Sequence, residues 1–152
     1  MLANGRKIGG ILIDVHGDLA GPISVVVGLG LNLIVSEATC NQVKADGGQP
    51  PIGLYELGFT ESRNLVAADL VSALVDLLRN YADTGFSRDK SFWCAHDFLR
   101  NKPVVVSGSS TLSGVAMGVN ELGYLRVVAE NGEQLVGAGD VSLRLNPQEP
   151  AR

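Results

Sequence analysis

The sequence predicts an α+β chain in which a strand pair and helices precede a small antiparallel β-barrel. Two short apolar runs rich in β-branched residues, Lys7–Asp14 and Ile23–Val35, have the pattern of buried strands. Apolar residues recur every three or four positions over Arg63–Tyr81, which is typical of an amphipathic helix. From Val104 to Leu145, short β-type runs alternate with turn sequences, the spacing expected of a small antiparallel barrel.

The first two runs are expected to form a hairpin that contains a ligand site. The residues between them, His16–Pro22, are rich in turn formers, so the two strands should be antiparallel. Both runs contain glycines, and a glycine inside a strand marks a bulge or the close approach of a ligand or another backbone. Lys7 begins the first run and Asn32 lies toward the end of the second. We interpret this pair as a ligand slot; a solvated lysine at a strand end and a glycine-relieved bulge are the alternatives.

The middle of the chain combines a long loop with two helices. Ser36–Gly53 has no apolar periodicity and contains three glycines and two prolines, so we expect a functional or disordered loop. Thr60 and Ser62 are candidate N-caps of the Arg63–Tyr81 helix. A second, shorter helix is expected over Phe86–Phe98.

Composition excludes several classes of protein. The chain has 152 residues, 45% of them apolar and 18% charged, which is an ordinary composition for a globular protein. Its net charge of -4 gives no reason to expect nucleic-acid binding, although it leaves local basic patches open. No apolar run approaches the ~20 residues that span a bilayer. The N-terminus lacks a signal-peptide layout, and Cys40 and Cys94 have neither metal-site spacing nor a disulfide framework. We therefore expect a cytoplasmic protein that by itself binds neither nucleic acid nor membrane.

The domain boundary is expected just before Pro103, where short β runs replace the helical pattern. This divides the chain into a first domain over residues 1–101, a barrel over 102–146 and a frayed tail over 147–152. A barrel of about 45 residues buries little apolar surface alone, so it should pack on the first domain. The first strand begins within six residues of Met1, as it does in independent domains and in chains cut from longer ones.

Taken in order, the motifs resemble the C-terminal half of a biotin protein ligase of the bacterial biotin-operon-repressor type. The pairing of Lys-x-x-Gly-Ile-Leu with Gly-x-Gly-x-Asn is specific in combination, although each motif alone is weak. Besides the amphipathic helix, the matching segments are Arg6–Ile13, Val26–Asn32, Trp93 with Asp97, Val115–Gly118 followed by Gly123, and Gly139–Arg144.

The resemblance implies both an activity and a fold. Enzymes of this family join biotin and ATP into biotinyl-5'-AMP with Mg2+, then transfer the biotinyl group to one lysine of a carboxylase carrier domain. The implied fold is part of a class-II-synthetase-like mixed sheet with helices, followed by an SH3-like barrel. Family members pair through their central sheets, so the resemblance is compatible with a homodimer.

The resemblance also assigns roles to individual residues. Adenylate formation builds up negative charge around a carboxylate and a phosphate, where a fixed cation is most effective if water is excluded. Lys7 is similar to the family lysine that contacts the biotin carboxyl and the phosphate, and Ser36–Gly53 corresponds to a lid over the adenylate. The other positions carried over are Gly10, Leu12, Gly28 and Leu29 for biotin, and Asn32, Asp140 and Arg144 for the nucleotide.

Two departures from the family pattern limit these expectations. The family lid often carries a tryptophan over the adenine, whereas this chain has Gln49-Pro50-Pro51 near that place. The Gly-Arg-Gly-Arg-type phosphate loop of the family's upstream half does not occur in these residues, so we expect the isolated chain to be weak or inactive. The alternative hypothesis is a truncated, non-catalytic remnant that acts only as a binding or dimerisation module.

Overall fold

The computed structural model describes residues 1–17, 21, 23–108, 110–137 and 142–146. The chain divides into two compact units, Met1–Val71 and Ser72–Arg152. The structure is mixed α and β, as the sequence predicts.

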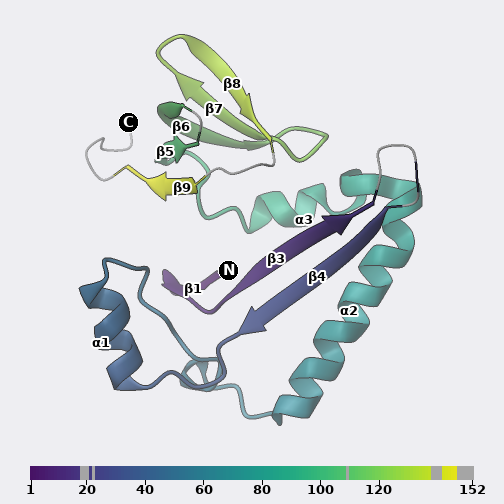
Figure 1. Cartoon of the computed structure of the whole chain (residues 1–152), viewed down its shortest axis with the longest axis vertical. Coiled ribbons are helices and arrows are strands. Elements are labelled where there is room, and N and C mark those ends of the chain that lie inside the picture. Colours follow the sequence, from purple (N-terminus) through teal and green to yellow (C-terminus); the bar gives the residue numbers. More distant parts are fainter. Residues whose placement is uncertain (18–20, 22, 109, 138–141, 147–152) are drawn as a thin grey trace. The chain divides into compact units, whose positions relative to one another are not determined.

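The first unit is built on the predicted antiparallel strand pair (Figure 1). Strands β3 (Gly9–His16) and β4 (Ser24–Leu31) pair over eight residues each, from Gly9 opposite Leu31 to His16 opposite Ser24. The expected antiparallel hairpin is therefore confirmed. These strands form a two-stranded sheet, so membership of a larger mixed sheet stays a prediction.

The predicted first strand is interrupted, because a separate hairpin precedes β3. Strands β1 (Leu2–Ala3) and β2 (Arg6–Lys7) form a second two-stranded antiparallel sheet. Asn4 and Gly5 form its turn and have positive φ angles of 50° and 72°. An Asn-Gly pair suits such a turn because both residues tolerate the left-handed conformation, and its twist matches that of the strands.

The expectation of an irregular loop over Ser36–Gly53 is wrong in part, because α1 (Glu37–Ala45) occupies its first half. The Ser36 side chain caps this helix by accepting a hydrogen bond of 3.1 Å from the Thr39 amide. None of its residues is buried. Since a helix without a buried face needs no apolar periodicity, its capping serine was the signal available in the sequence.

After α1 the chain returns to the strands and forms most of the buried part of this unit. Pro51, Ile52 and Gly53 are buried, and Lys7 forms an isolated parallel bridge with Pro51. A short 3-10 helix, η1 (Tyr55–Leu57), follows. The second half of the expected loop therefore belongs to the framework of the unit.

The predicted long helix is confirmed as α2 (Arg63–Thr84), which runs three residues further than expected. The Leu65 amide donates to the Ser62 hydroxyl over 3.4 Å, which favours Ser62 over Thr60 as the cap. The second helix is shorter than expected and split into η2 (Gly85–Arg88) and α3 (Lys90–Ala95). Gly85 has a φ of 56°, a left-handed conformation that ends α2.

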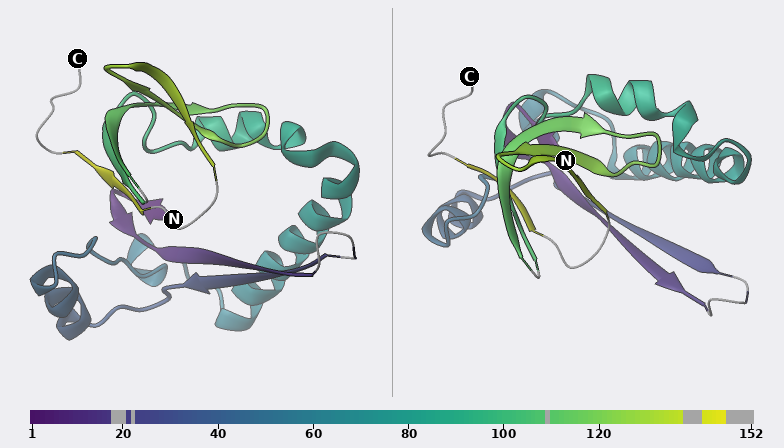
Figure 2. Two further views of the ribbon diagram at one scale, coloured as in Figure 1. Left: turned by 45° about the horizontal axis from the view of Figure 1, so that its top comes forward. Right: turned by 90° about the horizontal axis from the view of Figure 1, so that it is seen from above.

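The second unit contains a five-stranded antiparallel sheet in the order β8-β7-β6-β5-β9. This confirms the predicted run of short antiparallel strands, and Figure 2 shows that the sheet is strongly twisted. Its edge strands β8 and β9 are not paired with each other in that order, so an SH3-like barrel stays a prediction. The strands are β5 (Pro103–Ser107), β6 (Thr111–Val119), β7 (Leu125–Ala129), β8 (Gly132–Val136) and β9 (Ser142–Leu145).

One apolar cluster forms the core of the sheet. Val104, Ala116 and Val127 are fully buried, and Val106 is buried beside them. Strand β6 has a register shift between Ala116 and Val119, where Gly118 has a φ of 89°. Such an irregularity bends a strand, which allows β6 to pair with both β5 and β7 around this core.

The division of the chain into two units falls inside α2, between Val71 and Ser72. The sequence, by contrast, places a domain boundary just before Pro103. The sheet begins at that proline. The domain boundary expected after residue 101 stays a prediction. None of the helices in the described ranges is long and apolar enough to cross a membrane.

Candidate functional site

The backbone of Lys7 is held by hydrogen bonds on both sides. Its amide donates to the Pro50 carbonyl over 2.7 Å, and its carbonyl accepts a bond of 3.0 Å from the Ile52 amide. The same carbonyl accepts a bond of 3.1 Å from Nδ2 of Asn32. The structure therefore brings together Lys7 and Asn32, which are 25 residues apart in the sequence.

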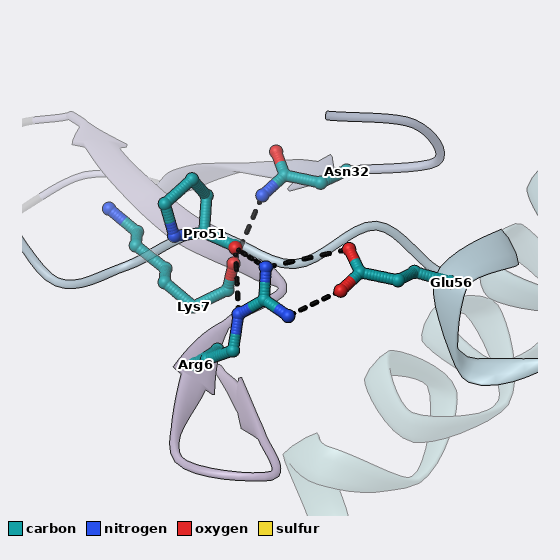
Figure 3. Close-up of polar contacts among 5 residues, drawn as sticks. All are labelled: Arg6, Lys7, Asn32, Pro51 and Glu56. Atoms are coloured by element: carbon teal, nitrogen blue, oxygen red, sulfur yellow. Dashed lines mark hydrogen bonds and ion pairs between the residues drawn. The ribbon is translucent and has the colours of Figure 1, made fainter. Parts of the chain in front are cut away.

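The ammonium group of Lys7 extends away from the ion pair formed by its neighbour Arg6 (Figure 3). The residue is exposed, and its Nζ has no ion pair or hydrogen bond with any residue the structure describes. A fixed backbone with an unpaired cation is suited to bind an anion.

Asn32 occupies a junction between β4 and the returning chain. Its amide donates to the Ile8 carbonyl and its own carbonyl accepts from the Leu54 amide, both over 2.8 Å. One side-chain N–H is engaged by Lys7, which leaves the other N–H and the side-chain carbonyl oxygen for a ligand.

Arg6 and Glu56 also belong to this site, although sequence reasoning did not single them out. The Arg6 guanidinium donates to the Pro51 carbonyl from Nε (3.1 Å) and Nη2 (2.6 Å), and its Nη1 pairs with Oε1 of Glu56. The hydrogen bond to Glu56 raises the pKa of Arg6, and a contact with Cys40 adds to this effect. No local sequence signal could have found this pair, since its members lie 50 residues apart.

The predicted biotin residues fall on two faces of the β3–β4 ribbon. Side chains alternate along a strand, and directly paired residues share a face. Gly10 lies opposite Gly30 and Leu12 lies opposite Gly28, so these four positions share one face. Leu29 lies opposite Ile11, which places its side chain on the other face.

The glycines of the ribbon are not equivalent. A methyl group added at Gly9 would overlap the carbonyl oxygen of Gly30, whereas one at Gly10 or Gly30 would meet no atom within 4 Å. At Gly28 it would make ordinary contact with Leu12. Gly9 is therefore required by backbone packing, and Gly10 and Gly30 leave open space over the face that they share with Leu12.

The remaining predicted site residues lie in the second unit. Arg144 is part of β9, opposite Val105 on β5, and its Nη1 donates to the Leu143 carbonyl over 3.0 Å. Asp140 lies outside the described residues. Among the described residues, no group of three or more His, Cys, Asp or Glu side chains could hold a metal ion.

Comparison with known proteins identifies relatives over nearly the whole chain. Residues 101–144 match the family model described as "Biotin protein ligase C terminal domain". The chain is 28% identical over 140 residues to "Bifunctional ligase/repressor BirA" of Salmonella typhimurium, an alignment that covers 91% of this chain and 42% of the relative. It is 26% identical over 143 residues to "Biotin--[acetyl-CoA-carboxylase] ligase" of Paracoccus denitrificans, covering 93% of this chain and 59% of that protein.

The fold has counterparts among solved structures. The apo biotin protein ligase from Aquifex aeolicus superposes with a TM-score of 0.78 at 21% identity, over 95% of this chain and 61% of that one. The same protein in complex with biotin and ATP gives 0.74 at 21% identity, over 93% and 57%. At this identity the likeness shows a shared fold. The chain spans between about two fifths and three fifths of the length of these proteins.

Proposed function

Because the chain is homologous to biotin protein ligases over more than nine tenths of its length, we propose that it serves ATP-dependent biotin ligation. The observation that supports this most is the site at Lys7, whose backbone is held by Pro50, Ile52 and the side chain of Asn32 and whose ammonium has no partner among the described residues. The reaction is the formation of biotinyl-5'-AMP from biotin and ATP, followed by transfer of biotin to a lysine of a carboxylase carrier domain.

In the first step a biotin carboxylate oxygen attacks the α-phosphorus of ATP. A new P–O bond forms, the bond to the β,γ-phosphates breaks, and pyrophosphate leaves. The Lys7 ammonium attracts both the attacking carboxylate and the phosphate oxygens, and this attraction is strongest when the ligand excludes water. In the second step the carrier lysine amine attacks the acyl carbon, AMP leaves, and the amine loses a proton as the amide forms.

The open face of the ribbon is the proposed floor for biotin. Gly10, Leu12 and Gly28 share this face, where a flat bicyclic ring lies against the backbone at Gly10. Leu29, the remaining predicted biotin residue, lies on the other face of the ribbon. Asn32, Asp140 and Arg144 are the proposed nucleotide residues, and the segment from Ser36 to Gln49 is the proposed lid.

The proposed ligands are biotin and ATP with Mg2+. Since the described residues contain no side-chain cluster for a metal ion, Mg2+ would be held mainly by phosphate oxygens and water, the usual arrangement for this ion with nucleotides. The proposed setting is the cytoplasm, and the macromolecular partner is the carrier domain.

A second candidate function is a binding or dimerisation module without catalysis. The observation that favours it is the exposure of apolar side chains on both faces of the β3–β4 ribbon, including Ile11 (55%), Leu12 (66%) and Val15 (63%). An isolated two-stranded sheet is only marginally stable in water. Its exposed apolar faces and the unpaired outer edges of its strands are surfaces on which another chain can pack or pair. A homodimer belongs to this proposal.

Titration of this chain with biotinyl-5'-AMP by calorimetry and thermal shift tests the site. We expect saturable binding and a rise in melting temperature that grows as RT ln(1 + [L]/Kd). Lys7→Ala should weaken the affinity at least about tenfold, as expected for a lost charge-assisted contact of ~1.4 kcal/mol or more. Arg63→Ala, which removes an exposed cation of the same unit at the start of α2, outside the proposed lid, should leave the affinity unchanged. A well-folded chain that gives no shift would support the non-catalytic module instead.

A further inference from the structure

We propose that Arg6 is a positioning residue for Lys7, and this inference rests on the ligand-binding role proposed for Lys7. Arg6 does not reach toward the Lys7 ammonium (Figure 3). Its guanidinium instead binds the returning chain at Pro51 and Glu56. Pro51 lies between the two residues that bond to the Lys7 backbone. The clamp formed by Arg6, Pro51 and Glu56 thereby sets the place from which the Lys7 side chain extends.

Pro51 is the centre of this clamp. The residues on either side of it, Pro50 and Ile52, make the two backbone bonds to Lys7. Pro51 has no N–H, so its carbonyl is its one backbone hydrogen-bonding group, and Arg6 supplies two donors to it, at 3.1 and 2.6 Å. Because Pro51 is buried, loss of these donors leaves a carbonyl without a partner and favours separation of this segment from β2.

Glu56 holds the other side of the guanidinium. Nη1 pairs with its Oε1, and Nη2 lies 3.4 Å from its Oε2, a fork arrangement that fixes the plane of the guanidinium. Both side chains are partly exposed, at 34% and 49%. Exposed ion pairs add little to global stability, so we expect the clamp to act on local geometry more than on the unfolding transition of the chain.

The chemistry of arginine distinguishes positioning from a simple effect of charge. A lysine at position 6 keeps the positive charge near Lys7 but lacks the planar fork that binds Pro51 and Glu56 together. If Arg6 acted through its charge on the ligand, Arg6→Lys would retain ligand affinity. If Arg6 positions the backbone, Arg6→Lys should behave like Arg6→Ala.

Amide hydrogen exchange tests the clamp without any ligand. In Arg6→Ala and Arg6→Lys, the amides of Lys7 and Ile52 should exchange about tenfold faster, as expected when a hydrogen bond to a charged donor is lost. The Ala116 amide, which bonds to Lys102 in the second unit, serves as an internal reference. Glu56→Gln provides a milder second variant in case Arg6→Ala fails to fold.

Arg126→Ala is the matched control. Arg126 forms an arginine–glutamate pair of similar exposure with Glu133 in the second unit, at 40% and 42%. We expect this variant to leave the exchange of the Lys7 and Ile52 amides unchanged. Unchanged exchange of these amides in the Arg6 variants as well would overturn the inference.

The affinity for biotinyl-5'-AMP provides the functional readout. Arg6→Ala should weaken binding about tenfold, and the Arg6→Ala/Lys7→Ala double variant should bind no more weakly than Lys7→Ala, since Arg6 acts through Lys7. Additive losses, or full affinity in Arg6→Lys, would contradict positioning. If the unaltered chain binds no adenylate, the proposed function fails, and hydrogen exchange still decides whether Arg6 holds the Lys7 backbone.

Discussion

Replacing the two adjacent glycines of β3 one at a time by alanine should have opposite effects. At Gly10 an added methyl group meets no atom within 4 Å, so Gly10→Ala should raise the free energy of unfolding by about 0.5 kcal/mol through reduced freedom of the unfolded backbone. At Gly9 the methyl group would overlap the Gly30 carbonyl oxygen and come within 2.8 Å of Cε of Met1. Overpacking of this kind costs about 1–3 kcal/mol.

The difference between the two variants should therefore be about 1.5–3.5 kcal/mol, in favour of Gly10→Ala. Urea unfolding followed by far-UV circular dichroism measures it, with the midpoint shift multiplied by a common slope. Equal stability of the two variants, or a greater loss in Gly10→Ala, would refute the assignment of Gly9 to backbone packing and Gly10 to open space.

The same variants test the proposed floor for biotin. If a ring lies against the backbone at Gly10, the methyl group of Gly10→Ala occupies that space and affinity for biotinyl-5'-AMP should fall even though the fold is intact. Retained affinity in this variant would place the ligand away from the face that Gly10 shares with Leu12 and Gly28.

Two further predictions concern α1 and the second unit. Ser36→Ala removes the helix cap and should cost about 1 kcal/mol locally, seen as faster exchange of the Thr39 and Cys40 amides with little change in melting temperature, because α1 buries no residue. In the sheet, the hydrogen bond from Arg126 holds the pKa of Glu133 below its ordinary value of 4.5. A lowered folded pKa means that the ionised Glu133 stabilises the fold above pH 4.5 and that this contribution is lost as the pH falls through the folded value. Arg126→Gln should return the pKa toward 4.5 in an NMR titration; an unchanged pKa would show that the ion pair does not form in solution.

The length of the chain relative to its relatives bears on every activity assay. The chain spans 42% of the Salmonella relative, so a ligase assay tests whether these residues suffice for the reaction. Ligand titration and hydrogen exchange measure the Lys7 site directly. Apolar exposure on both ribbon faces also makes oligomeric state a useful measurement to accompany each titration.

Local sequence patterns predicted the longer regular elements. Apolar runs and helical periodicity located the β3–β4 strands, α2 and the strands of the sheet. The expectation that the first two strands are buried is wrong, because most of β3 and β4 is exposed, whereas the sheet of the second unit forms a buried apolar cluster. The prediction also failed for α1, which buries no residue, and for the helix after Gly85, where a 3-10 segment precedes α3.

The sequence by itself therefore determined the order of the longer elements, the pairing of β3 with β4, and the motif that includes Lys7 and Asn32. Tertiary structure alone decided what surrounds that motif. Arg6 meets Glu56, and Lys7 meets Pro51, across more than 40 residues of intervening chain. Likewise, strand register decided that Gly9 rather than Gly10 lies against the opposing backbone. Such contacts depend on how segments far apart in the sequence pack together, and local sequence propensities do not determine this packing.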